Sequence, residues 1–173
     1  TLFRSVMASA EEGIASIYKG TLGKFLPRGE ELKKGLMASL RGTVVGLALG
    51  LLPGMISSLT AFLIYDIEKR ISKYPERFGT GVIEGVAAPE AANNATAQAG
   101  FIPLIAMGIP TAPIFGILLA ALMMYGLTPG PLLFVQHREF IWTVIASMYL
   151  GNVMLLVLNL PLVAVWARLC LIP

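Results

Sequence analysis

The sequence has few charged residues and few of the residues that form cross-links or metal sites. Charged side chains make up 13% of its 173 residues, whereas soluble domains carry about 25%. It holds one cysteine, Cys170, and one histidine, His137, which excludes an internal disulfide and gives no ligand cluster for a metal. No Ser-His-Asp order, phosphate-binding loop or basic patch with interleaved aromatics is present, so the usual hydrolase, nucleotide-binding and nucleic-acid patterns are missing.

The sequence is rich in apolar residues, which make up 56% of the total, and the mean hydropathy of the whole chain is +0.77. The net charge is only +3, and the basic residues gather in two stretches, 19–35 and 66–77. Long uncharged runs between short basic segments are typical of an integral membrane protein with basic cytoplasmic loops. We therefore expect an all-α, multi-spanning membrane protein.

The first half of the chain predicts helices that surround a break. Apolar residues at helical spacing over 2–18 predict an amphipathic helix. The glycines at 42, 46 and 50 share one face of a helix over 36–52, which we interpret as a packing seam. Pro53-Gly54 ends that helix and a second one follows over 55–65. Because both ends of 36–65 are basic, we favour a hairpin with Pro53-Gly54 at its tip, the alternative being one kinked crossing.

The second half predicts shorter helices followed by one full membrane span. A polar helix is expected over 79–100 with Pro89 in its first turn, then short apolar helices over 101–109 and 112–126. Residues 140–167 carry no charge and predict a transmembrane helix with Trp142 and Trp166 in the two interfacial belts. The chain thus divides into an amphipathic helix and basic cytoplasmic loop (1–35), a core of broken or re-entrant helices (36–136) and a transmembrane helix (137–173).

The stretch 78–131 is where we expect a binding site. It contains no Lys or Arg and many Gly and Pro residues, yet it carries the polar residues Glu84, Glu90, Asn93, Asn94, Thr96 and Gln98. A helix that faces lipid does not tolerate these polar side chains. Broken helices that line a polar site inside a membrane protein commonly carry them, which is why we expect a site here.

The carboxylates and amides of this stretch suggest two roles. A carboxylate at membrane depth must be protonated, find donors or bind a cation, so we assign Glu84, Glu90 and Thr96 to a coupling ion, either sodium or a proton. The alternatives are an interfacial loop residue for Glu84 and a helix N-terminal charge for Glu90. Asn93 and Asn94 offer donors and acceptors to a carboxylate substrate, unless they only join helices.

Two helix breaks complete the predicted site. Pro53 and Gly54 precede a helix that starts near Ser57, and Pro110 and Thr111 precede another. The free N–H groups and positive dipole end of a helix start bind anions without a basic side chain. Arg41 is interpreted either as a side chain that reaches the interface or as an anion contact.

The motifs resemble those of a known family. GLLPG (50–54), EKRISKYPERFGTGVIEGVAAPEAANNATAQAG (68–100), MGIP (107–110) and GLTPGPLLF (126–134) resemble the large membrane subunit of tripartite tricarboxylate transporters, the TctA family. The resemblance covers about residues 36–135, and the chain is similar to the second half of such a subunit. Thr111 stands where the family usually has the last Gly of GIPG.

The resemblance implies a bacterial inner-membrane permease made of two related halves. It implies uptake of citrate and similar carboxylates driven by an ion gradient, with a small membrane subunit and a periplasmic solute-binding protein as partners. No organic cofactor is expected. Two other functions remain open from the sequence: a structural membrane subunit without a substrate site, and a membrane-embedded enzyme with Glu84 or Glu90 as acid or base.

Overall fold

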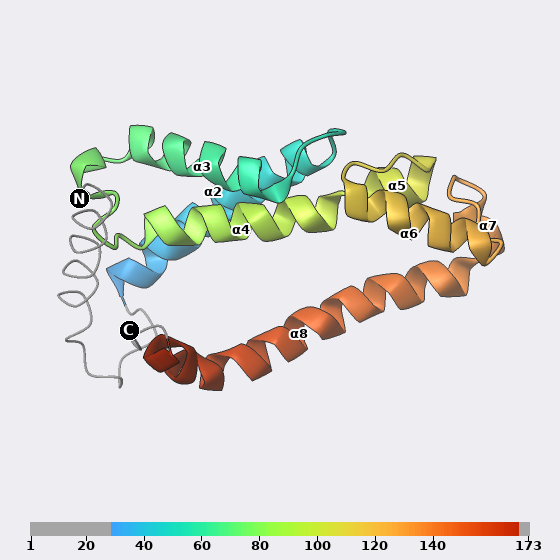
Figure 1. Ribbon diagram of the computed structural model, residues 1–173. Coiled ribbons are helices and arrows are strands. Elements are labelled where there is room, and N and C mark those ends of the chain that lie inside the picture. Colours follow the sequence, from blue (N-terminus) through green and yellow to red (C-terminus); the bar gives the residue numbers. More distant parts are fainter. Residues whose placement is uncertain (1–28, 170–173) are drawn as a thin grey trace, which may run out of the picture. The chain divides into compact units, whose positions relative to one another are not determined.

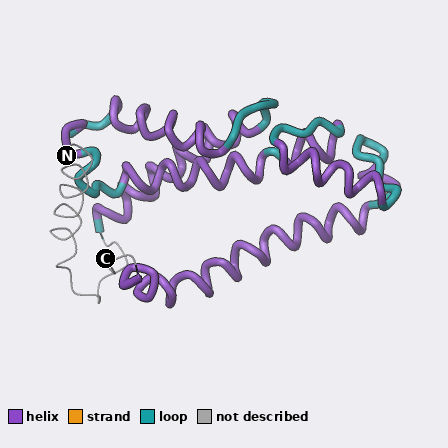
Figure 2. Tube along the Cα trace, in the orientation of Figure 1, coloured by secondary structure: helices purple, strands orange, loops and turns teal. Residues whose placement is uncertain are grey.

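The structure is a computed structural model that describes residues 29–169, with side chains described for 29–162. Every regular element in that range is helical (Figure 2). The elements are α2 (Glu30–Gly50), α3 (Ser57–Ile71), η1 (Pro75–Arg77), α4 (Glu84–Ala99), α5 (Phe101–Met107), α6 (Pro113–Met124), α7 (Leu133–Gln136) and α8 (Arg138–Leu169). The predicted all-helical class is confirmed. The helix predicted over 2–18 and Cys170 lie outside the described residues.

Residues 28–156 form one compact unit, and the segments 1–27 and 157–173 are assigned to a second. The helices of the first unit position the site. The first two of these helices, α2 and α3, form an antiparallel hairpin with Pro53-Gly54 in the connecting loop (Figure 1). The hairpin predicted over 36–65 is therefore confirmed as a fold, and the alternative of one kinked helix is excluded. The described basic residues on its two flanks lie at the open end of the hairpin.

The helix boundaries differ from the predicted ones where charged residues occur. α2 begins at Glu30, within the segment predicted as a loop, and α3 continues to Ile71. Glu30 and Glu31 in the first turn of α2, and Lys69 and Arg70 in the last turn of α3, complement the helix dipoles. These charges therefore stabilise helix ends instead of interrupting the helices.

The predicted position of Pro89 was also wrong. α4 begins at Glu84, so Pro89 lies inside the helix and not in its first turn. Because proline has no N–H, the carbonyl of Gly85 loses its partner four residues along the helix. The same boundary removes the interpretation of Glu90 as a charge at the start of the helix.

The predicted glycine seam is confirmed, and it packs α2 against α4. Gly42, Gly46 and Gly50 are buried, and they contact the backbone of α4. A methyl group added at Gly50 would lie 2.7 Å from the carbonyl oxygen of Thr96, and one at Gly46 would lie 2.8 Å from the Cα of Ala92. Both contacts join residues 46 positions apart, so α2 and α4 run parallel. Small residues allow this close approach of two helix backbones.

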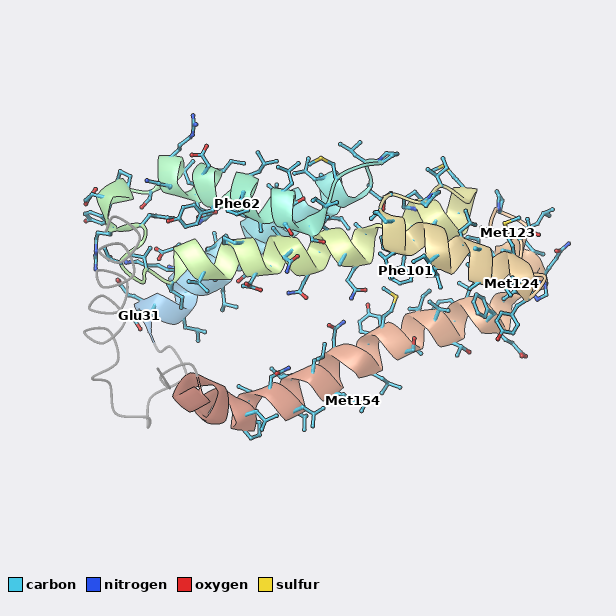
Figure 3. All side chains as sticks on the ribbon, in the orientation of Figure 1. Glu31, Phe62, Phe101, Met123, Met124 and Met154 are labelled. Atoms are coloured by element: carbon cyan, nitrogen blue, oxygen red, sulfur yellow. The ribbon has the colours of Figure 1, made fainter. Side chains whose placement is uncertain are left out.

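The rest of the unit continues from the end of α4. Gly100 separates α4 from α5, and Gly108, with φ of 69°, ends α5 in the left-handed conformation. The Gly130 N–H donates to the carbonyl of Ile105 at 2.9 Å, which holds the loop after α6 against α5. Many apolar side chains point away from the helices, as Phe62 does on α3 with 76% of its surface exposed (Figure 3).

α8 matches the predicted transmembrane helix. Its segment Arg138–Leu162 has a mean hydropathy of 1.9 and is the one helix among the described residues that is long and apolar enough to cross a membrane. Trp142, on the first turns, is exposed. The side chain of Trp166 lies outside the described residues, so its predicted interfacial position stays a prediction.

Candidate functional site

The two predicted helix breaks meet in the structure. The backbone N–H of Gly54, in the loop between α2 and α3, donates to the carbonyl oxygen of Thr111 at 2.9 Å. Gly54 has a φ of 85°, a conformation that glycine adopts without strain. Residues 57 positions apart in the sequence are thus held together by the backbone, and we call this contact the junction.

Two helices begin at the junction. α3 starts at Ser57 and α6 at Pro113, and neither start is capped by a side-chain hydrogen bond. Figure 1 shows that α3 and α6 leave the junction in opposite directions, so their N-terminal ends face the same region. The positive dipole ends and the unpaired N–H groups of the first turns attract negative charge.

Thr111 is packed against the end of α4. Its side chain is 3% exposed, and a methyl group added at Gly100 would lie 2.7 Å from its hydroxyl oxygen. The ring of Phe115 on α6 also lies against Gly100 and stacks edge-to-face on Phe101 at a centroid distance of 5.1 Å. Thr111 has a negative φ, so the backbone here accepts a residue other than glycine.

Asn93 lies beside the first turns of α3. It is half-buried and lines a cavity of about 480 Å³ together with Ser58, Phe62, Tyr65 and Pro89. Within the described part of the chain, no hydrogen bond is formed by the Asn93 amide. A half-buried amide with free donors and an acceptor, next to a serine hydroxyl, can bind a polar ligand.

Glu90 and Asn94 lie on a different face of α4. Both are exposed, as is Gln98 one turn further, and these three residues follow each other at intervals of four. The Asn94 amide donates to the backbone carbonyl of Glu90 at 2.9 Å. The Glu90 carboxylate forms no hydrogen bond or ion pair with the described residues.

Glu84 lies at the other end of α4, nine residues before Asn93, which is about 14 Å along a helix. It is half-buried and lines a cavity with Arg41 and Glu68. Arg41 on α2 holds Glu68 on α3 through two hydrogen bonds, of 2.6 and 2.7 Å. Glu68 is 2% exposed, so Arg41 neutralises a carboxylate buried between the helices.

Thr96 uses its hydroxyl for helix packing. The hydroxyl donates to the carbonyl oxygen of Gly46 at 3.1 Å, and the side chain is 3% exposed. It therefore fastens α4 to α2 in the middle of the glycine seam.

The structure brings together only part of the predicted site. Pro53, Gly54, Pro110 and Thr111 lie at the junction, Ser57 starts the helix beside it, and Asn93 lies next to the following residue, Ser58. Glu84, Glu90 and Asn94 lie elsewhere on α4.

Three residues of this region were not singled out by the sequence. Ser58 adjoins the predicted helix start near Ser57 but was given no role of its own. Gly100 could have been noticed as the glycine between a polar and an apolar helix. Glu68 sits in a charged run, and nothing in the sequence indicates that it is buried.

Comparison with known proteins identifies the family. A model described as "Tripartite tricarboxylate transporter TctA family" matches residues 2–173. The chain belongs to this family. TctA proteins are the large membrane subunit of tripartite tricarboxylate transporters, which is a family of transporters and not of enzymes. The expected resemblance is confirmed.

Two curated relatives come from Agrobacterium vitis. One, "Uncharacterized 52.8 kDa protein in TAR-I ttuC' 3'region", is 48% identical over 134 residues, which cover 78% of this chain and 27% of that protein. The other, "Uncharacterized protein in TAR-II ttuC' 3'region", is 47% identical over 128 residues, which cover 74% of this chain and 53% of that protein. The chain thus spans about a quarter and about half the length of these relatives. No solved structure matches it.

Proposed function

We propose that the chain forms part of the substrate site of a secondary permease that takes up carboxylates, such as tri- and dicarboxylates, driven by an ion gradient. The junction is the observation that carries the proposal. Two discontinuous helices, α3 and α6, begin there without side-chain caps, and Gly54 is bonded to Thr111. Discontinuous helices whose N-terminal ends point at an anionic substrate are a recurring device of secondary transporters.

The lengths of the helices support a junction at membrane depth. α4 and α5 together cover 84–107, which corresponds to about 36 Å of helix, against about 30 Å for the hydrocarbon core. The loops at Gly54 and Thr111 lie beside Gly100, two thirds of the way along this pair. In this proposal, α2–α3 enters from one side as a re-entrant hairpin, and irregular backbone is tolerated because it lines a site.

The substrate contacts in this proposal are the unpaired N–H groups in the first turns of α3 and α6 and the side chains near Ser57 and Asn93. The chain has no Lys or Arg between Arg77 and Arg138, so negative charge must be held by backbone dipoles and amides. Asn93 supports this role because its amide is half-buried, free of other hydrogen bonds among the described residues and next to the first turns of α3.

For the coupling ion, sodium or a proton, we propose Glu90 ahead of Glu84 and Thr96. Glu90, Asn94 and Gln98 form an exposed polar face of α4, and lipid would not accept such a face. The face must therefore border other protein or a water-filled path, where a carboxylate binds a cation or a proton. Glu84 lies beside Arg41, and the Thr96 hydroxyl is bound to Gly46, which makes both poorer ligands.

Membership of the TctA family supports a proposal for the whole assembly. We propose a bacterial inner-membrane protein that crosses the membrane several times, in which 36–136 is one transport repeat of an inverted pair and 137–173 a transmembrane helix. A small membrane subunit and a periplasmic solute-binding protein are its partners.

The test compares two neighbouring asparagines. In the intact transporter, Asn93→Ala should lower ion-gradient-driven uptake of radiolabelled carboxylate by a factor of about 10–100. The variant leaves a buried polar group of the bound substrate without its hydrogen-bond partner, which costs about 1–3 kcal/mol of binding free energy. Asn94→Ala is the comparison variant: its amide is bound to its own helix on the face assigned to the coupling ion, so any loss there should be a changed dependence on sodium or pH and not a raised KM for the carboxylate.

Membrane expression of both variants is measured by immunoblot, and uptake is assayed against mono-, di- and tricarboxylates with and without sodium. Full uptake by a well-expressed Asn93→Ala variant would contradict the proposed substrate site. Uptake of no carboxylate by the unmodified transporter would contradict the proposed function itself.

A further inference from the structure

The charged ends of three helices surround a cavity that the proposed transport site does not use. The start of α2, the end of α3 and the start of α4 meet at the open end of the hairpin (Figure 1). A cavity of about 400 Å³ lies between them, and its polar lining consists of Lys34, Arg41, Glu68, Ser72, Lys73 and Glu84, with the Tyr74 ring at its edge.

The positive charges of this cavity are available to a ligand. Arg41 binds Glu68 through Nε and Nη2, which leaves the hydrogens of its Nη1 free of that pair. Lys34 and Lys73 form no ion pair within the described residues. Two lysines from different segments of the chain therefore line one cavity without an ion-pair partner among the described residues.

The charge balance selects the ligand. Three cations against the carboxylates of Glu68 and Glu84 leave a surplus of one positive charge. A phosphodiester carries a single negative charge and several acceptor oxygens, which matches this surplus, the ammonium groups and the Ser72 hydroxyl. An anion with more charge, such as a tricarboxylate, would face uncompensated repulsion from Glu84.

The surroundings of the cavity indicate a lipid as the source of that phosphodiester. A second cavity of about 320 Å³ shares Lys34, Arg41 and Glu84 and adds Glu30, Lys33 and Met37. Leu36 and Leu40, three residues along α2 from Lys33 and Met37, are 62% and 59% exposed, and Ile71, which lines the first cavity, is 57% exposed. The acyl chains of a lipid can pack against these exposed apolar side chains while its headgroup contacts the unpaired lysines.

We propose that this cavity binds the phosphodiester headgroup of an anionic phospholipid such as phosphatidylglycerol. The inference rests on the proposed placement of α2, α3 and α4 in the membrane with their basic ends at the cytoplasmic headgroups. Basic pockets between membrane helices on that side recognise anionic headgroups. The lipid would hold the ends of α2 and α3 at a fixed depth.

The experiment measures lipid binding to the purified full-length protein in detergent by native mass spectrometry. Phosphatidylglycerol should bind in preference to phosphatidylcholine. The double variant Lys34→Gln and Lys73→Gln should weaken that binding by about thirtyfold, because basic side chains at an anionic surface act additively. Lys69→Gln is the matched control, since Lys69 is exposed in the last turn of α3 and does not line the cavity.

The outcomes distinguish a lipid headgroup from a free anion and from general surface charge. Equal binding by the double variant, equal loss in the Lys69→Gln control, or no preference over phosphatidylcholine overturns the proposal. Displacement of the lipid by millimolar inorganic phosphate also overturns it, because the site would then accept a free anion. Unchanged thermal unfolding of the double variant shows that a loss of binding is not a loss of fold.

Transport and lipid binding fail independently in this design. Asn93→Ala should lower uptake and keep phosphatidylglycerol binding, since Asn93 lies about 14 Å along α4 from Glu84. Lipid binding lost in the double variant supports the headgroup site even if the unmodified transporter takes up no carboxylate. Carboxylate uptake without any lipid preference contradicts only the headgroup site.

Discussion

At the scale of single residues, the structure changes the interpretation of Arg41 most. The sequence left two possibilities, a side chain at the interface or an anion contact. The anion is Glu68, which lies 27 residues away on the neighbouring helix of the hairpin. No local pattern could identify this partner, because Glu68 stands among charged residues that are typical of a loop. Which carboxylate of this charged run is buried depends on which face of α3 packs against α2, and the sequence near Glu68 does not show that face.

This pair predicts an asymmetric response to mutation. Arg41→Gln leaves Glu68 buried without its partner and should lower the free energy of unfolding by about 3 kcal/mol, the low end of the range for broken buried pairs because Arg41 is partly exposed. Replacing both residues by leucine should recover most of this loss. Unfolding in mixed detergent micelles measures the difference.

The control is the exposed pair between Arg70 and Asp66, four residues apart on α3. Arg70→Gln should change the free energy of unfolding by less than about 0.5 kcal/mol. Equal effects of Arg41→Gln and Arg70→Gln would show that the Arg41 pair does not hold the hairpin together.

At the scale of elements, the existence and order of the helices could be predicted, and their ends could not. The glycine spacing at 42, 46 and 50 identified the packing face of α2, because a small residue at every fourth position places a continuous strip of exposed backbone on one side of a helix. Pro89 was misplaced because proline favours a first turn in general. Here α4 begins five residues earlier, and its central proline faces α3 instead of α2.

The seam predicts opposite effects of the same substitution at two helical glycines. Alanine improves helix propensity by about 1 kcal/mol at either position. At Gly46 the added methyl would meet the backbone of Ala92, so Gly46→Ala should destabilise the protein by about 1–3 kcal/mol in total. At Gly151 on α8 there is no described atom within reach of the methyl, so Gly151→Ala should be neutral or stabilising.

Thermal unfolding midpoints of the two variants in the same detergent measure this difference. A stabilising effect of Gly46→Ala would mean that α2 and α4 are further apart than the backbone contact indicates. Loss of the Thr96 hydrogen bond to Gly46 is expected to accompany the destabilisation.

At the scale of the whole molecule, the sequence predicted which breaks matter but not what they contact. Pro53-Gly54 and Pro110-Thr111 were each predicted to precede a helix start that binds an anion, but nothing in the sequence shows which segment each break contacts. The structure joins them through one backbone hydrogen bond, which no side-chain pattern encodes. The carboxylates were harder to place, because hydrophobic context alone does not show that Glu84 and Glu90 lie on different sides of α4.

The arrangement predicts the depth of each end of the unit in the membrane. The variants are made in a background with Cys170→Ser. The cysteine of Lys73→Cys should react with a membrane-impermeant maleimide only from the cytoplasmic side, because position 73 lies at the basic open end of the hairpin. Tyr125 is 85% exposed at the far end of α6, so the cysteine of Tyr125→Cys should react only from the opposite side. The cysteine of Ser58→Cys, next to the junction, should react slowly from either side, and the transported carboxylate should protect it from the maleimide. Labelling of positions 73 and 125 from the same side would contradict a unit that spans the bilayer.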